Sequence, residues 1–201
     1  AIPCEQQVYF CPLHGQPLKY NMEKDVWSEY VPVENHSAVQ VGLSQSSQSK
    51  PQYQVYLEQL EKLTPIQEYR AGSAYKFCMV LEDRVDIYPR FHPTSEWDTS
   101  AGQCLLERIG GGLVDFQGRP FVYNQRLSLL NGGFIAYRNN DMKKLALQAL
   151  ELMPSSAWAK NWACYSVFWI IELLVIMVLE LLPPSMLKAI DLLPDAKTPV
   201  T

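Results

Sequence analysis

The chain has 201 residues, which is enough for one domain with a substantial hydrophobic core. Its composition, 48% hydrophobic and 19% charged, is that of a folded globular protein. The formal net charge of −4 excludes the broad basic surface of nucleic-acid-binding proteins, so we expect no nucleic-acid partner. An anionic small molecule must then be held by local Lys and Arg side chains and by helix ends.

The five cysteines are scattered and form no C-x-x-C pair. This usage favours free thiols in a reducing, cytoplasmic compartment over a disulfide scaffold. Cys4, Cys11 and His14 lie close in sequence, but their spacing is unusual for a zinc site, and a fourth ligand is missing.

The first part of the chain predicts short strands followed by one helix. Residues 7–10 and 18–20 flank Leu13-His-Gly-Gln16 and predict a β-hairpin. Residues 39–43 predict a strand. Apolar side chains then recur at helical spacing and predict a helix that Thr64-Pro65 ends, namely Tyr53, Tyr56, Leu57, Leu60 and Leu63.

Further along, strands and helices alternate. The expected elements are a strand at 66–69, a helix from Ala74 to about Leu81 with Ser73 as its N-cap, a strand at 85–88, a helix from Trp97 to Ile109 ended by glycines 110–112, strands at 113–115 and 133–136, and a surface helix at 141–152. This alternation predicts an α/β layered domain with a partly parallel sheet. Ligands of such sheets gather at strand ends and helix N-termini.

Residues 138–201 differ in character because they contain a long apolar run at 163–182, which Pro183-Pro184 ends. At about 1.5 Å per residue the run just spans a bilayer. Glu172 lies near its middle, where a charge costs roughly 3 kcal/mol. Three interpretations stay open: a marginal membrane anchor, a helix packed on a partner, or a foreign extension.

Asp98 is the strongest candidate for a functional acid. It follows Trp97 just inside a predicted helix N-terminus and precedes a run of small residues. A carboxylate there stays ionised and can face a cation, or contact a ligand held at the helix end. The alternative is an ordinary helix-start acid, because Asp is common in first turns. One Asp cannot hold a catalytic metal by itself.

Several segments match a known signature: Gly72-Ser-Ala-Tyr-Lys-Phe-Cys78, Tyr88-Pro-Arg-Phe91, Pro93-Thr94, Trp97-Asp-Thr99, Ala101-Gly102, Asp115, Gln117-Gly118 and Leu130-Asn131. Through them the chain resembles the CysQ-type 3'(2'),5'-bisphosphate nucleotidases of the inositol monophosphatase-like family. The likeness covers residues 3–137 and corresponds to the C-terminal half of that family's fold. Residues 1–137 are therefore expected to be the C-terminal, α/β/α half of a layered sugar-phosphatase-like domain. Residues 138–201 are expected to be a helical extension with an apolar tail.

The resemblance implies a magnesium-dependent phosphatase. Its substrate would be adenosine 3',5'-bisphosphate (PAP), which yields AMP and phosphate, or the related PAPS, which yields APS. Asp98 would ligate Mg²⁺ and contact the substrate. Some relatives associate with the cytoplasmic face of the inner membrane, which would suit a tail anchor. A homodimer also stays open.

Three further residues are substrate-binding candidates through the same resemblance. Ser73 and Lys76 match an S-x-x-K motif that contacts the phosphate and base region of the nucleotide. Arg90 matches a substrate-binding Arg, whose guanidinium can fork onto phosphate. Inositol-specific relatives carry an acid near this position, so Arg90 favours a bisphosphorylated nucleotide. The alternatives are an N-cap Ser beside a solvated Lys, and a surface Arg.

The sequence also departs from the family. An upstream acidic pair and a D-P-x-D-G-T motif, which supply the other metal ligands, are absent from these 201 residues. Ser47 stands where relatives often have a His. We therefore expect a fragment that lacks the N-terminal metal ligands and is inactive alone. An inositol-phosphate phosphatase and a non-catalytic phosphate-binding or membrane-tethered module are the competing hypotheses.

Overall fold

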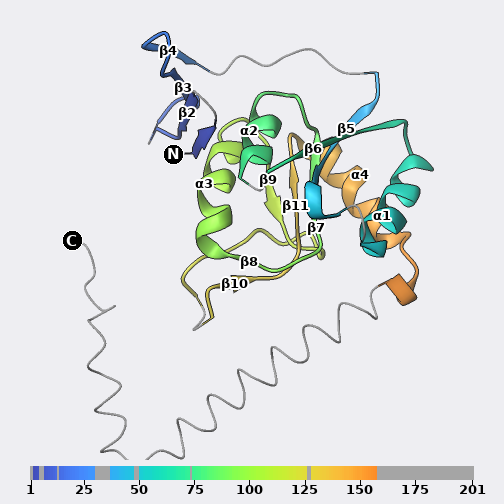
Figure 1. Ribbon diagram of the computed structural model, residues 1–201. Coiled ribbons are helices and arrows are strands. Elements are labelled where there is room, and N and C mark those ends of the chain that lie inside the picture. The colour runs from blue at the N-terminus through green and yellow to red at the C-terminus, as the bar shows by residue number, and fades with distance from the viewer. Residues whose placement is uncertain are drawn as a thin grey trace, which may run out of the picture. The chain divides into compact units, whose positions relative to one another are not determined.

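The computed structural model describes residues 2–4, 7–12, 14–29, 37–47, 50–72, 74–125 and 128–157 (Figure 1). The predicted apolar run at 163–182 and the candidate Ser73 lie outside these residues. Within the described ranges, no helix has both the length and the apolar character needed to cross a bilayer. The residues from Ala1 to Met153 form one compact unit.

The N-terminal part of this unit is a four-stranded antiparallel sheet. Its strands pair in chain order: β1 (Ile2–Cys4), β2 (Gln7–Phe10), β3 (Leu18–Asn21) and β4 (Val26–Glu29). The predicted hairpin is confirmed, because β2 pairs antiparallel with β3 and Gly15 adopts a positive φ of 93° in the connecting turn.

The central sheet has five strands in the order β6-β5-β7-β11-β9. They are β5 (Val39–Ser44), β6 (Ile66–Ala71), β7 (Ile87–Arg90), β9 (Gly112–Val114) and β11 (Phe134–Tyr137). β5 runs parallel to β6 and β7, whereas β11 is antiparallel to β7 and β9. The predicted partly parallel sheet is thus confirmed. A short ladder of β8 (Thr94–Ser95) with β10 (Leu130–Asn131) lies apart from it.

Helices cover both faces of the central sheet (Figure 1). α2 (Tyr75–Leu81) and α3 (Glu96–Glu107) pack together, and α1 (Pro51–Glu61) packs on α4 (Asn140–Glu151). A short 3₁₀ turn, η1 (Gln45–Ser47), follows β5. Because both faces are covered, the middle strands are buried almost throughout. This three-layer arrangement confirms the expected α/β class.

The α4 helix belongs to the compact unit. Its N-cap residue Asn139 accepts hydrogen bonds from the backbone N–H groups of Asp141 and Met142. Its apolar face is buried through Ala146, Ala149 and Leu150, and the helix contacts β7 and β11. The compact unit therefore extends beyond residue 137, to Met153.

Candidate functional site

The parallel strands bring three chain segments to one edge of the sheet. Ser44 at the end of β5 pairs with Ala71 at the end of β6. Val41 of β5 pairs with Ile87 of β7, so the strand ends at Ser44 and Arg90 lie at the same level. The carboxyl ends of parallel strands are where ligands bind in open α/β sheets. Ala71, Gly72 and Arg90, all in or next to the sequence motifs, lie at this edge.

Lys76 lies inside the protein beside this edge. Its side chain is fully buried, and Nζ donates hydrogen bonds to the backbone carbonyls of Ala71 (3.1 Å) and Gly72 (2.9 Å). The ammonium also lies 4.6 Å from the centre of the Tyr88 ring. The Lys76 stem packs beside Gly42 of β5, where an added Cβ would be in ordinary contact with Lys76 Cδ at 3.5 Å and would crowd Val85 Cγ1 at 3.0 Å.

Burial and charge make Lys76 an unusual lysine. Burial, with a further contribution from the positive charge of Arg90, lowers the pKa of Lys76 to about 7. The ammonium has three donors, and the two carbonyls use two of them. At neutral pH the group therefore exchanges readily between charged and neutral forms, and a nearby anion would favour the charged one.

Arg90 and His92 continue the same electropositive region. Arg90 Nη1 donates to the hydroxyl of Tyr88 at 3.4 Å, so this guanidinium and the Lys76 ammonium both contact Tyr88. Burial lowers the pKa of His92 to about 4, with contributions from the charges of Lys50 and Arg90. His92 is therefore neutral at physiological pH. No sequence motif assigned a role to His92, and the structure places it close to the charges of Lys50 and Arg90.

Buried polar atoms near the strand ends make no hydrogen bond within the described residues. They include Ser44 Oγ at the end of β5, His92 Nε2 after β7 and Thr94 Oγ1 in β8. Buried polar atoms are normally satisfied by protein, water or a ligand. Of these residues, Ser44 is level with Arg90 in the sheet and His92 is close enough to respond to the charge of Arg90, so both offer polar atoms near the cationic groups. No sequence pattern singled out Ser44, because an Oγ becomes significant only when its burial is known.

Asp98 lies at the third position of α3, and its carboxylate is exposed. Its Oδ2 accepts a hydrogen bond from the backbone N–H of Ser95 at 3.0 Å, which is the return half of a capping box. Both interpretations of this residue are therefore compatible with its geometry, because it caps the helix through Oδ2 and the residue is exposed. Ser95 and Asp98 also fix the start of α3 one residue before the predicted position.

The described residues do not by themselves build a magnesium site. Among them, no three His, Cys, Asp or Glu side chains converge on a point where a metal ion could bind. Mg²⁺ demands six oxygen ligands in a near-octahedral arrangement, of which the Asp98 carboxylate would supply only a part. The donor set fits a contribution to a metal site and not a complete one.

Comparison with known proteins places these features in a family. A model described as the inositol monophosphatase family matches residues 3–152, which includes the whole central sheet and α1 to α4. The chain belongs to the inositol monophosphatase family. The match ends at residue 152, one residue before the end of the compact unit at Met153.

Within the inositol monophosphatase family, the similar proteins include CysQ nucleotidases. The 3'(2'),5'-bisphosphate nucleotidase CysQ of Escherichia coli K12 is 44% identical over 77 residues, or 38% of this chain and 31% of that protein. CysQ of Buchnera aphidicola is 38% identical over 79 residues, or 38% and 30% of the two chains. The predicted resemblance to the CysQ type is confirmed.

A solved structure of the inositol monophosphatase family supports the fold. CysQ from Bacteroides thetaiotaomicron matches with a TM-score of 0.57 at 25% identity, over 67% of this chain and 55% of that one. The chain thus spans about a third of the length of the curated relatives and about half of this structure.

Proposed function

We propose that this chain is the phosphate-recognising part of a magnesium-dependent 3'(2'),5'-bisphosphate nucleotidase. Such an enzyme removes the 3'-phosphate of PAP, giving AMP and inorganic phosphate, and would convert PAPS to APS in the same way. The observation that carries the proposal is the convergence of Lys76 and Arg90 at the carboxyl edge of the parallel strands. The CysQ relatives, whose printed names give this activity, support the choice of substrate class.

Electrostatics favours a phosphate at this edge. Arg90 and Lys76 repel each other, which is part of the reason for the low pKa of Lys76. A phosphate dianion between or beside them would relieve this repulsion and hold the Lys76 ammonium in its charged form. Arg90 adds a planar fork that can bind two phosphate oxygens at once. Ser44 Oγ and His92 Nε2, which are close to Arg90, offer further hydrogen bonds.

Arg90 also bears on the choice between substrates. An acid near this position suits an inositol ring, which offers hydroxyl donors, whereas a guanidinium suits a second phosphate. With Lys76 and Arg90 both cationic, the region matches a ligand that carries more negative charge than a single phosphate monoester. A bisphosphorylated nucleotide fits this requirement better than an inositol monophosphate.

Magnesium enters the proposal through Asp98. The exposed carboxylate of Asp98 is a suitable ligand for a hard cation, and a bound Mg²⁺ would supply charge neutralisation and water activation in phosphate hydrolysis. Because the described residues do not assemble the remaining ligands, hydrolysis needs acids from outside this set. We therefore expect the chain as given to bind PAP without turning it over.

Calorimetric titration of the full 201-residue chain tests the proposal. We expect PAP to bind at least about tenfold more tightly than 5'-AMP, because one charge-assisted phosphate contact contributes about 1.5–3 kcal/mol. Inositol 1-phosphate should bind as weakly as AMP. Equal affinity for PAP and AMP would contradict recognition of the 3'-phosphate, and tighter binding of inositol 1-phosphate would favour the competing substrate class.

A further inference from the structure

Two cysteines from distant parts of the sequence meet on the protein surface. Cys11 directly follows β2, and Cys104 lies in α3, 93 residues later. Their Sγ atoms are 2.7 Å apart, with Cys104 donating to Cys11. Cys11 Sγ also contacts the backbone carbonyl of Cys104 at 3.3 Å. Both are free thiols, so the two sulfurs are in contact without being bonded.

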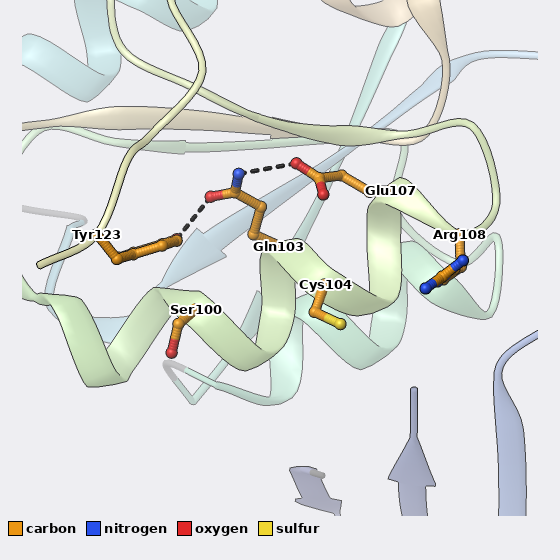
Figure 2. A pocket seen from close by; sticks show the side chains of 6 residues that line it. All are labelled: Ser100, Gln103, Cys104, Glu107, Arg108 and Tyr123. Carbon is orange, nitrogen blue, oxygen red and sulfur yellow. Dashed lines mark hydrogen bonds between the residues drawn. The ribbon is translucent and has the colours of Figure 1, made fainter. Parts of the chain in front are cut away.

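Cys104 is accessible to a small reagent. It is exposed and lines a cavity of about 440 Å³ beside α3 (Figure 2). The other lining residues are Ser100, Gln103, Glu107, Arg108 and Tyr123. Gln103 links two of the other lining residues, because it accepts a hydrogen bond from the Tyr123 hydroxyl at 2.6 Å and donates one to Glu107 at 2.8 Å. Arg108 places a cation beside the thiol, which suits a reagent that carries carboxylates.

Cys78 provides a contrast. Cys78 lies in α2 and is completely buried. A reagent that reaches Cys104 through the cavity cannot reach Cys78 without unfolding the helix layer. Of Cys11, Cys78 and Cys104, only Cys11 and Cys104 are therefore open to this chemistry.

We propose that Cys11 and Cys104 form a reversible disulfide when the chain meets a low-molecular-weight disulfide such as oxidised glutathione. The bond would connect the N-terminal sheet to α3, the helix whose first turn contains Asp98. The proposal is independent of the proposed nucleotidase function, since it rests on the sulfur contact and on the access to Cys104.

The reaction is two successive thiol–disulfide exchanges. One cysteine sulfur loses its proton and attacks a sulfur of the reagent, which forms a mixed disulfide and releases one reagent thiol. The second cysteine sulfur loses its proton and attacks the protein sulfur of the mixed disulfide, which releases the other reagent thiol. The two protein thiols are oxidised, the reagent disulfide is reduced, and the released thiolates take up both protons.

The surroundings keep the pair reduced until such a reagent arrives. Partial desolvation of the thiol, together with the hydrogen bond to Cys11, raises the pKa of Cys104 to about 11. A protonated thiol is a poor nucleophile, so slow reaction with alkylating reagents at neutral pH is expected for Cys104. Intramolecular closure is nevertheless favoured, because the second sulfur is already in contact with the first.

The test is oxidation of the full chain with excess oxidised glutathione, followed by thiol counting and peptide mapping by mass spectrometry. We expect two of the five thiols to disappear, one linked peptide pair that contains Cys11 and Cys104, and full reversal by dithiothreitol. The melting temperature should rise by roughly 5–10 °C, because the bond closes a long loop.

Single variants separate closure from simple modification. Cys11→Ser should stop the reaction at a stable glutathione adduct on Cys104, whereas Cys78→Ser should form the Cys11–Cys104 bond as the unmodified chain does. A persistent adduct on Cys104 in the unmodified chain, without a linked pair, would overturn the proposal. A linked pair that uses a different cysteine would overturn it as well.

Discussion

Replacing Arg90 by Ala should weaken PAP binding by about 10- to 100-fold. Arg90 lies at the end of β7, level with the strand ends of the proposed phosphate site, and its guanidinium contacts Tyr88 beside the Lys76 ammonium. The variant loses the charge-assisted hydrogen bonds from the two guanidinium nitrogens to phosphate. Such a contact contributes about 1.5–3 kcal/mol to the binding free energy. Calorimetric titration with PAP measures the change.

Two further variants make this result interpretable. Arg90→Lys keeps the charge but loses the planar fork, so its affinity should lie between those of the parent and Arg90→Ala. Arg84→Ala is the matched control. Arg84 is an exposed arginine just past the C-terminal end of α2, where it interacts with Tyr75 and Glu82. The affinity of the Arg84→Ala chain for PAP should be unchanged. PAP binding by a folded Arg90→Ala chain at the parent affinity would remove Arg90 from the site.

Replacing Gly102 by Ala should destabilise the fold by about 1–3 kcal/mol. A Cβ at Gly102 would lie 2.4 Å from Cγ of Phe77, which is closer than atoms can approach. Phe77 cannot move aside freely, because it is buried and packs against Tyr88 and Phe134. The gain in helix propensity from Gly to Ala, up to about 1 kcal/mol, offsets only part of this cost. Thermal unfolding should show a melting temperature lower by roughly 3–10 °C.

The control for Gly102 is Gly132→Ala. No atom lies within 4 Å of a Cβ built at Gly132, and the backbone there does not have a positive φ. Its stability should change by less than about 0.5 kcal/mol. The double variant Gly102→Ala, Phe77→Leu should recover part of the loss if the ring is the obstacle. A Gly102→Ala chain as stable as the parent would mean that α2 and α3 separate more easily than their contact indicates.

Periodicity and turn chemistry predicted most of the described fold. The strands and helices from Gln7 to Glu151 that the sequence indicated lie within one or two residues of their observed positions. β4 was missed because all four of its residues are exposed, so Val26 and Trp27 follow no alternating pattern of burial. β8 and β10 were missed because two-residue strands carry no period.

The candidate site was less predictable than the fold. Motif likeness identified Asp98, Lys76 and Arg90, and a solvated side chain was the alternative interpretation of Lys76. The structure instead buries Lys76 and directs its Nζ to the carbonyls of Ala71 and Gly72. Lys76 is buried because β5 packs against its side chain at Gly42. Such a contact between residues distant in the chain produces no pattern in the sequence around Lys76.

The alternatives for the single residues are now narrower. Asp98 takes part in a capping box, so its effect on stability is expected whether or not it binds a metal. Arg90 is half-buried beside other charged groups, which argues against the hypothesis of a solvated surface arginine. Ser73 lies outside the described residues, and its proposed substrate contact stays a prediction.

The most direct measurement for the proposed site is the pKa of Lys76 with and without PAP. This pKa can be measured by NMR titration of the full chain with ¹³C-labelled lysine. The Lys76 signal is assigned as the one that is missing in the Lys76→Arg variant. In the free chain we expect one lysine to titrate near pH 7. Bound PAP should raise this pKa by about one unit or more, since a nearby phosphate favours the charged ammonium. The affinity of the chain for PAP should therefore fall as the pH rises through 7. A Lys76 pKa that stays unchanged when PAP binds would contradict a phosphate site at this edge of the sheet.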